Sequence, residues 1–222
     1  YVAPKDGVLN VWVAPIGDLA QAKVITNDQK RGIRSYFWAW DSKTILYVQD
    51  KGGDENWHVY AVPSMGGETK DLTPLEGVRA NIVGTSQKFP TKLVVGLNDR
   101  DKRFHDLYTI DLVDGSKTLL QKNEGYARFL LDHDLKVRMA QKALPTGGLA
   151  FEKKTDKGFA PFFEIPYEDT STTFPMGFDA ANQSVYMADS RGQNVSGLVS
   201  MDMATGKTKA IWSPDKADLN RI

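Results

Sequence analysis

One sequence motif occurs three times in this chain, and its period constrains the fold more than any other feature. Each copy has an apolar stretch that ends in Asp, a polar loop, a second apolar stretch and a turn containing glycine. The turn glycines Gly67, Gly115 and Gly206 are separated by 48 and 91 residues, and 91 is about two periods. A repeat of roughly 40–50 residues that holds several short strands is typical of β-propeller blades. The sequence therefore predicts an all-β fold, a β-propeller.

The repeat divides the chain into about five blades within one propeller domain, residues 1–222. The first blade lacks its first strand, because Tyr1–Pro4 already matches the second strand of the next blade, Tyr47–Asp50. The fourth blade is the most divergent copy, and residues 216–222 resemble the start of a further strand. The predicted blades are residues 1–29, 30–76, 77–123, 124–171 and 172–215.

The incomplete first blade leaves open strand edges, which favour pairing with other strands. Either residues 218–222 complete the first blade and close a small ring, or the chain is a segment of a seven- or eight-bladed propeller. We predict the second arrangement, because the chain starts within a blade and stops without a turn. We also expect the isolated chain to dimerise edge to edge, or to pair residues 218–222 with 1–4 or 9–13.

Composition excludes some classes of partner. The 222 residues carry 28 basic and 28 acidic side chains, so no charge imbalance supports nucleic-acid binding. No apolar run approaches the roughly 18 residues of a membrane span, so we predict no membrane partner. The absence of cysteine excludes disulfides, zinc–thiolate sites and thiol catalysis. The three histidines show no metal-ligand spacing, so we predict neither a metal nor a cofactor. Periplasm and cytoplasm both stay open as compartments.

Longer strings within the repeat carry a resemblance. The order of turn Asp, apolar strand, Asp, polar loop, Tyr-containing strand, Gly-Gly-Glu and Leu-Thr resembles the propeller repeats of two groups. One group is the Tol-system periplasmic propellers, and the other is the N-terminal propeller of the prolyl oligopeptidase family of serine peptidases, with its dipeptidyl- and acylaminoacyl-peptidase branches. The strings most similar to the peptidase propellers are Asn10–Pro15, Trp38–Trp40, Asp54–Tyr60, Leu72–Pro74 and Asn98–Tyr108.

The resemblance to the peptidases implies a non-catalytic role for this chain. In that family a separate α/β-hydrolase domain carries the nucleophile in a Gly-x-Ser-x-Gly turn. The chain has no such string, and neither Ser86 nor Ser196 has the flanking glycines. We therefore predict no catalytic residue here and no activity of the chain alone. The resemblance implies that the parent protein is a serine peptidase. The expected partners are the α/β-hydrolase domain of that same parent chain and peptide substrates, whose access to the active site the propeller gates.

Two other functions stay open at this point. A stand-alone Tol-like propeller would be a protein-binding module, and a propeller lyase or glycosidase would need clustered catalytic side chains at the loop tips. Scattered histidines argue against a lyase.

Three residues are candidate substrate contacts. The acidic pair Asp54 and Glu55 precedes Trp57, and an acidic pair over a peptidase cavity can bind a substrate's free α-amino group, as in the dipeptidyl branch that the chain resembles. The acidic helix motif of that branch is not recognisable here. Arg103, in the basic stretch 100–103, can meet a substrate carboxylate or a partner domain. The alternative for all three is a solvated loop.

Asp50, Asp99 and Asp189 recur at the ends of the second strands. They form either a ring of carboxylates near one loop face or a set of turn aspartates that bind their own loops. Recurrence in every well-formed blade favours the structural interpretation.

Overall fold

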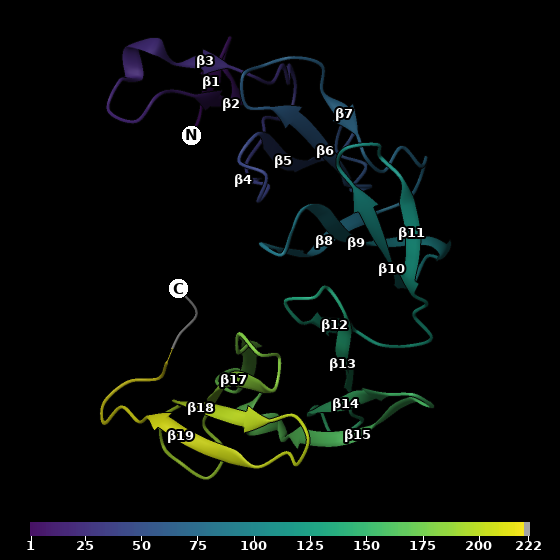
Figure 1. The fold of residues 1–222 in the computed structure, drawn as a ribbon, viewed down its shortest axis with the longest axis vertical. Coiled ribbons are helices and arrows are strands. Elements are labelled where there is room, and N and C mark those ends of the chain that lie inside the picture. Colours follow the sequence, from purple (N-terminus) through teal and green to yellow (C-terminus); the bar gives the residue numbers. More distant parts are fainter. Residues whose placement is uncertain (220–222) are drawn as a thin grey trace. The chain divides into compact units, whose positions relative to one another are not determined.

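The computed structural model describes residues 1–219, which form nineteen antiparallel strands and two short 3₁₀ turns. The strands make one three-stranded and four four-stranded sheets, and within each sheet neighbouring strands follow one another along the chain (Figure 1). The chain divides into two compact units, residues 1–124 and the part from Gly125 onward. The described residues contain no helix with the length and hydropathy needed to span a bilayer.

The first unit contains three sheets. The first sheet holds three strands, the second and third hold four each, and the 3₁₀ turn η1 (Leu19–Gln21) lies in the first. The strands are β1 (Val2–Lys5), β2 (Val8–Val13) and β3 (Lys23–Val24); β4 (Tyr36–Trp38), β5 (Thr44–Gln49), β6 (His58–Pro63) and β7 (Lys70–Asp71); β8 (Ala80–Ser86), β9 (Phe89–Asp101), β10 (Phe104–Asp111) and β11 (Lys117–Gln121).

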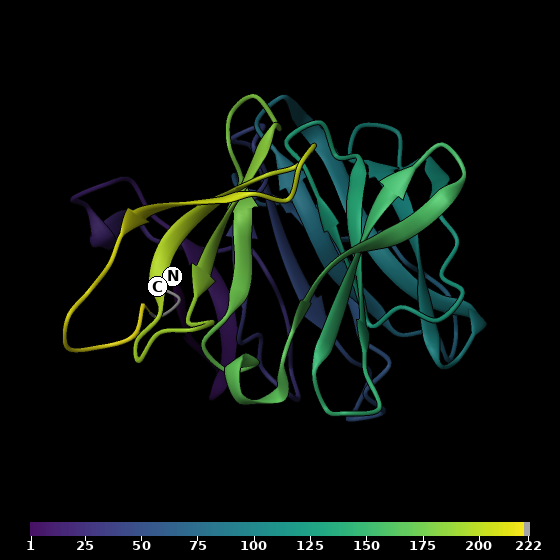
Figure 2. The same ribbon diagram turned by 90° about the horizontal axis from the view of Figure 1, so that it is seen from below.

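The second unit contains two four-stranded sheets. The 3₁₀ turn η2 (Tyr167–Asp169), a short green coil in Figure 2, connects them, and the green strands of the fourth sheet twist strongly in the same view. The strands are β12 (Arg128–Leu131), β13 (Val137–Ala143), β14 (Leu149–Thr155) and β15 (Gly158–Ile165); β16 (Phe174–Phe178), β17 (Ser184–Asp189), β18 (Gly197–Asp202) and β19 (Thr208–Trp212).

The all-apolar run in β5 explains how neighbouring sheets pack in the first unit. Successive strand residues point to opposite faces of a sheet. Ile45 lies in a core cluster with Val11 of the first sheet, whereas Leu46 lies in a cluster with Leu93 and Val95 of the third. A strand that is buried on both faces needs apolar residues at consecutive positions, and this run provides them.

The second unit is built in the same way. Phe151 of β14 and Met139 of β13 share a core cluster with Val185 and Met187 of β17. Phe151 also stacks on Phe163 of β15, with ring centroids 4.6 Å apart. Apolar faces of consecutive sheets therefore pack against each other in both units.

The outer strands β3 and β7 are short, with two residues each. A threonine hydroxyl replaces the next ladder bond in both sheets. Thr73 Oγ1 accepts a 3.0 Å hydrogen bond from Val59 N, and Thr26 Oγ1 accepts one of 2.9 Å from Val11 N. Both threonines are buried, so the hydroxyl satisfies a backbone N–H that water does not reach.

The predicted fold class is confirmed: the chain is all-β and its sheets are propeller blades, the first with three strands. Each sheet lies inside one of the five residue ranges given above. The described part of the tail forms no strand, and Asp218 Oδ1 accepts a 2.7 Å hydrogen bond from Ser196 N. Residues 220–222 lie outside the described residues, so the expected pairing of residues 218–222 stays a prediction.

Candidate functional site

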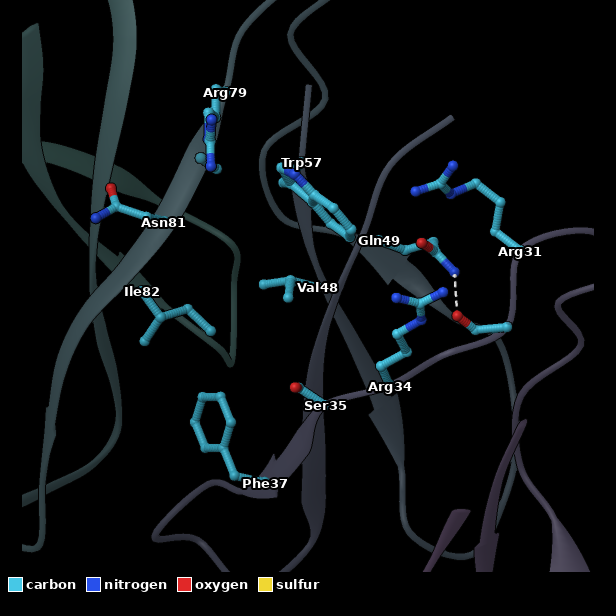
Figure 3. A pocket seen from close by; sticks show the side chains of 12 residues that line it. Arg31, Arg34, Ser35, Phe37, Val48, Gln49, Trp57, Arg79, Asn81 and Ile82 are labelled. Atoms are coloured by element: carbon cyan, nitrogen blue, oxygen red, sulfur yellow. Dashed lines mark hydrogen bonds between the residues drawn. The ribbon is translucent and has the colours of Figure 1, made fainter. Parts of the chain in front are cut away.

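A pocket of about 460 Å³ lies between the second and third sheets of the first unit. Its lining comes from the inner strands of both sheets and from the loops before them, as Figure 3 shows. The lining includes Phe37 of β4, Val48 and Gln49 of β5, Trp57 before β6, and Asn81 and Ile82 of β8.

Apolar side chains form much of the pocket wall. Phe37, Val48, Trp57 and Ile82 are half-buried, so part of each side chain faces the pocket. In Figure 3 Phe37, Val48 and Ile82 lie around one side of the space, and Trp57 lies across it. Such a wall favours the burial of an apolar part of a ligand.

Three arginines, Arg31, Arg34 and Arg79, also line the pocket, and no acidic residue does. Arg31 Nε lies 2.8 Å from Oδ1 of Asp50, outside the lining. The side chains of Arg34 and Arg79 have no hydrogen-bond or ion-pair partner among residues 1–219 and are exposed. The pocket therefore carries two positive charges that the described protein leaves uncompensated.

Backbone geometry positions the segment that carries Arg31 and Arg34. Gly32 has φ +74°, and a Cβ there would lie 3.1 Å from the backbone N of Leu9. Ile33 N donates to Leu9 O at 2.8 Å, which ties the segment to β2. The Gln49 amide donates to Asp28 Oδ2 at 2.6 Å and to Gly32 O at 3.2 Å, the bond dashed in Figure 3. Gln49 is thus a structural clamp for the arginine segment.

The predicted acidic pair lies on the loop beside Arg31. Asp54 accepts hydrogen bonds from the backbone of Lys51 and from the backbone and side chain of Asn56, at 3.1–3.2 Å. The side-chain bond from Asn56 is the main reason that the pKa of Asp54 lies below its usual value. Glu55 is exposed, has φ +59°, and donates its backbone N–H to Asp50. A Cβ on Gly53 would lie 2.8 Å from Arg31 Nη1, so this loop borders the pocket.

Arg103 lies elsewhere, in the two-residue turn between β9 and β10. It binds Asp101 through Nε at 3.1 Å and Nη2 at 2.9 Å, and its guanidinium lies over the Phe104 ring. The Arg103 side chain lowers the pKa of Asp101 to about 2. Of the basic stretch, Arg100 therefore lies in β9, whereas Lys102 and Arg103 form the tip of the hairpin. Within it, Arg100 makes a bidentate ion pair with buried Asp106, at 2.7 and 2.8 Å.

The recurring strand-end aspartates each bind locally. Asp50 accepts the Glu55 backbone N–H at 3.2 Å, Asp99 accepts that of Arg100 at 3.0 Å, and Asp189 accepts that of Arg191 at 3.1 Å. These contacts are those of turn aspartates. Within the described residues no group of three or more acidic, histidine or cysteine side chains is arranged to hold a metal ion.

Sequence reasoning missed the arginines of the pocket. One available signal was position, because Arg34 and Arg79 both precede the first strand of their sheet. Arg31 differs from Arg34 and Arg79 because it pairs with Asp50, nineteen residues further along the chain. The repeat pattern carries no information about this ion pair.

The chain is similar to curated proteins that carry peptidase names. It is 42% identical over 221 residues to dipeptidyl aminopeptidase BIII of Pseudoxanthomonas mexicana, which is 99% of this chain and 32% of that protein. The chain spans about a third of the length of the curated relatives that it matches. No protein-family profile matches it.

Solved structures show the fold. Oligopeptidase B of Leishmania major matches 95% of this chain and 32% of its own, with a TM-score of 0.55 and 13% identity. TolB of Acinetobacter baumannii matches 94% of this chain and 49% of its own, with a TM-score of 0.54 and 19% identity. The chain is thus a β-propeller segment similar over almost its whole length to part of a dipeptidyl aminopeptidase, and the expected resemblance to the prolyl oligopeptidase-family propeller is confirmed.

Proposed function

We propose that this chain is the non-catalytic propeller part of a serine peptidase with dipeptidyl-peptidase activity, and that it gates the access of peptides to an α/β-hydrolase active site. The 42% identity to dipeptidyl aminopeptidase BIII, which extends over almost the whole chain, carries the proposal. The chain has no Gly-x-Ser-x-Gly turn, which fits a role outside the chemistry.

Among the three candidate substrate contacts, Glu55 best fits a role in binding a substrate's α-amino group. Asp54 accepts hydrogen bonds from its own loop, and Arg103 is paired with Asp101. The Glu55 carboxylate is exposed on the loop that borders the pocket, and a carboxylate is the chemical partner of an ammonium group.

The experiment compares the full-length protein with the 222-residue chain. We expect the full-length protein to release chromophore from a dipeptidyl p-nitroanilide, and a serine-directed phosphonate to block the release. The chain alone should release none. Phosphonate-sensitive turnover by the chain alone, or no turnover by the full-length protein, contradicts the proposal.

A matched pair of variants in the full-length protein tests Glu55. Glu55→Gln should raise KM for dipeptidyl substrates with a free α-amino group, because it removes the charge that pairs with the ammonium. Glu68→Gln, at an exposed position outside the pocket lining, serves as control. An equal KM in both variants would assign Glu55 to the solvated loop.

The alternative function, a Tol-like protein-binding module, is supported by fold alone. TolB is 19% identical to this chain, and likeness at that level carries no information about partners. The turnover experiment decides between the two, because a binding module would leave the full-length protein without hydrolase activity.

A further inference from the structure

The arginine pocket has many hydrogen-bond donors and few acceptors. Several donors of the lining make no hydrogen bond to another described residue. They are the guanidinium groups of Arg34 and Arg79, the indole N–H of Trp57 and the amide of Asn81. An arginine guanidinium has five N–H donors and no acceptor, and indole is a donor only. A ligand that fills this space therefore has to supply acceptor atoms.

The charge of the lining selects an anion. Three guanidinium groups face the pocket, and among residues 1–219 only that of Arg31 has a carboxylate neighbour, Asp50. Arg34 and Arg79 come from different sheets, so they approach the space from two sides, with Trp57 between them in Figure 3. Planar guanidinium groups bind carboxylates in bidentate, charge-assisted pairs.

The apolar wall selects among anions. Phe37, Val48 and Ile82 would stay in contact with water if the ligand were a bare inorganic anion. A ligand with an apolar group next to its carboxylate covers these side chains and pairs with the arginines at the same time. The C-terminal residue of a peptide has this chemistry when its side chain is apolar.

We infer that this pocket binds the C-terminal carboxylate of a short peptide with an apolar last residue, Arg34 and Arg79 holding the carboxylate and Phe37, Val48 and Ile82 holding the side chain. The choice of a peptide as ligand rests on the proposed function. The carboxylate site itself rests on the pocket. It is separate from the contact proposed for Glu55, which concerns the opposite end of a peptide.

The test measures binding of acetyl-Ala-Phe and its C-terminal amide to the full-length protein by calorimetry, after treatment with a serine-directed phosphonate. The acetyl group removes the α-amino group, and the phosphonate blocks the hydrolytic site. We expect the acid to bind at least about tenfold more tightly than the amide, since one charge-assisted hydrogen bond is worth about that factor.

Variants assign the preference to the pocket. Arg34→Ala and Arg79→Ala should each weaken binding of the acid about tenfold and leave binding of the amide unchanged. Lys209→Ala, which removes an exposed cation on β19 outside the lining, should change neither. Thermal melts verify folding, and Arg34→Gln and Arg79→Gln replace an alanine variant that fails to fold.

Equal affinity for acid and amide overturns the inference, as does unchanged acid affinity in both arginine variants. Displacement of the acid by inorganic phosphate at a lower concentration would assign the pocket to phosphate and also overturn it. If the untreated full-length protein hydrolyses no dipeptidyl substrate, the proposed function fails. An acid preference that disappears in the arginine variants would then still support the carboxylate site.

Discussion

Arg31 Nε lies 2.8 Å from Oδ1 of Asp50, and the Asp50 side chain is completely buried whereas that of Arg31 is 41% exposed. The distance is that of an ion pair, although no described residue gives Oδ1 a directed hydrogen bond. The other oxygen, Oδ2, accepts the Glu55 backbone N–H at 3.2 Å, so Arg31 supplies the positive charge beside this carboxylate and Glu55 supplies a neutral donor. Removal of Arg31 and removal of Asp50 should therefore have different consequences. Arg31 without its partner can turn toward water, whereas buried Asp50 cannot.

This asymmetry predicts that Arg31→Ala destabilises the protein more than Asp50→Asn. The first variant leaves a buried carboxylate without its cation, which costs about 2–4 kcal/mol when the partial exposure of Arg31 is taken into account. In the second variant the guanidinium is free to move into solvent. Urea denaturation of the two variants and of the double variant measures the effects and their coupling. An equal loss in the two single variants would show that Asp50 does not need its partner.

The buried hydroxyl of Thr73 predicts a local effect on the second sheet. Thr73→Val keeps the shape of the side chain but leaves the N–H of fully buried Val59 without its 3.0 Å acceptor. An unsatisfied buried donor costs about 1–3 kcal/mol. Faster amide hydrogen exchange at Val59, together with lower stability in urea, would verify this.

Thr73→Ser is the matched control, because it retains the hydroxyl and removes only a methyl group. It should keep the slow exchange at Val59. If serine and valine accelerate exchange equally, the hydroxyl is not the acceptor that protects this amide.

Two glycines without left-handed backbone predict opposite responses to alanine. A Cβ on Gly148 would lie 2.7 Å from the backbone O of Ile165, so Gly148→Ala forces β14 and β15 apart and should cost about 1–3 kcal/mol. A Cβ on Gly177 has open space around it, so Gly177→Ala should be close to neutral or slightly stabilising. Thermal denaturation of both variants gives the comparison, and equal melting temperatures would contradict it.

The fold follows from the sequence to a large extent because its signals are local. The second strands contain the runs 45–48 and 93–97, which carry no charged residue and lie within β5 and β9. The points at which the outer strands end are harder to predict from the sequence, because the hydroxyls of Thr26 and Thr73 replace backbone hydrogen bonds there. Sequence patterns do not distinguish a side-chain acceptor from a backbone one.

The site followed from the sequence much less. The acidic pair was found, but the bonds that Asp54 forms within its own loop were not. The basic stretch 100–103 contains no sequence signal that β9 extends to Asp101, where Arg100 binds Asp106. Such pairings depend on strand register across a hairpin, which a bulge between Phe104 and Asp106 shifts, and the spacing of residues along the chain does not encode that shift.

The Arg100–Asp106 pair predicts a pH dependence of stability. The hydrogen bond from Arg100 is the main reason that the pKa of buried Asp106 lies below its usual value of 3.8, and the Asn123 backbone N–H lowers it further. A carboxyl with a depressed pKa in the folded state stabilises the fold above its unfolded pKa. This stabilisation is lost progressively as the pH falls from about 3.8 toward the folded value.

Asp106→Asn should therefore cost about 1.5–3 kcal/mol at neutral pH, the usual worth of hydrogen bonds to a charged group. The difference in unfolding free energy between wild type and variant should shrink below pH 3.8, where the wild-type carboxyl of the unfolded chain is protonated. Urea denaturation from pH 7 to pH 3 measures it. Arg100→Ala provides the control background, because it removes the hydrogen bond that is the main cause of the low Asp106 pKa. In that background Asp106→Asn should change the unfolding free energy less, and the change should depend less on pH. In the protein that retains Arg100, the Asp106→Asn difference in unfolding free energy could instead stay constant down to pH 3. That result would show that the ion pair does not lower the pKa of Asp106.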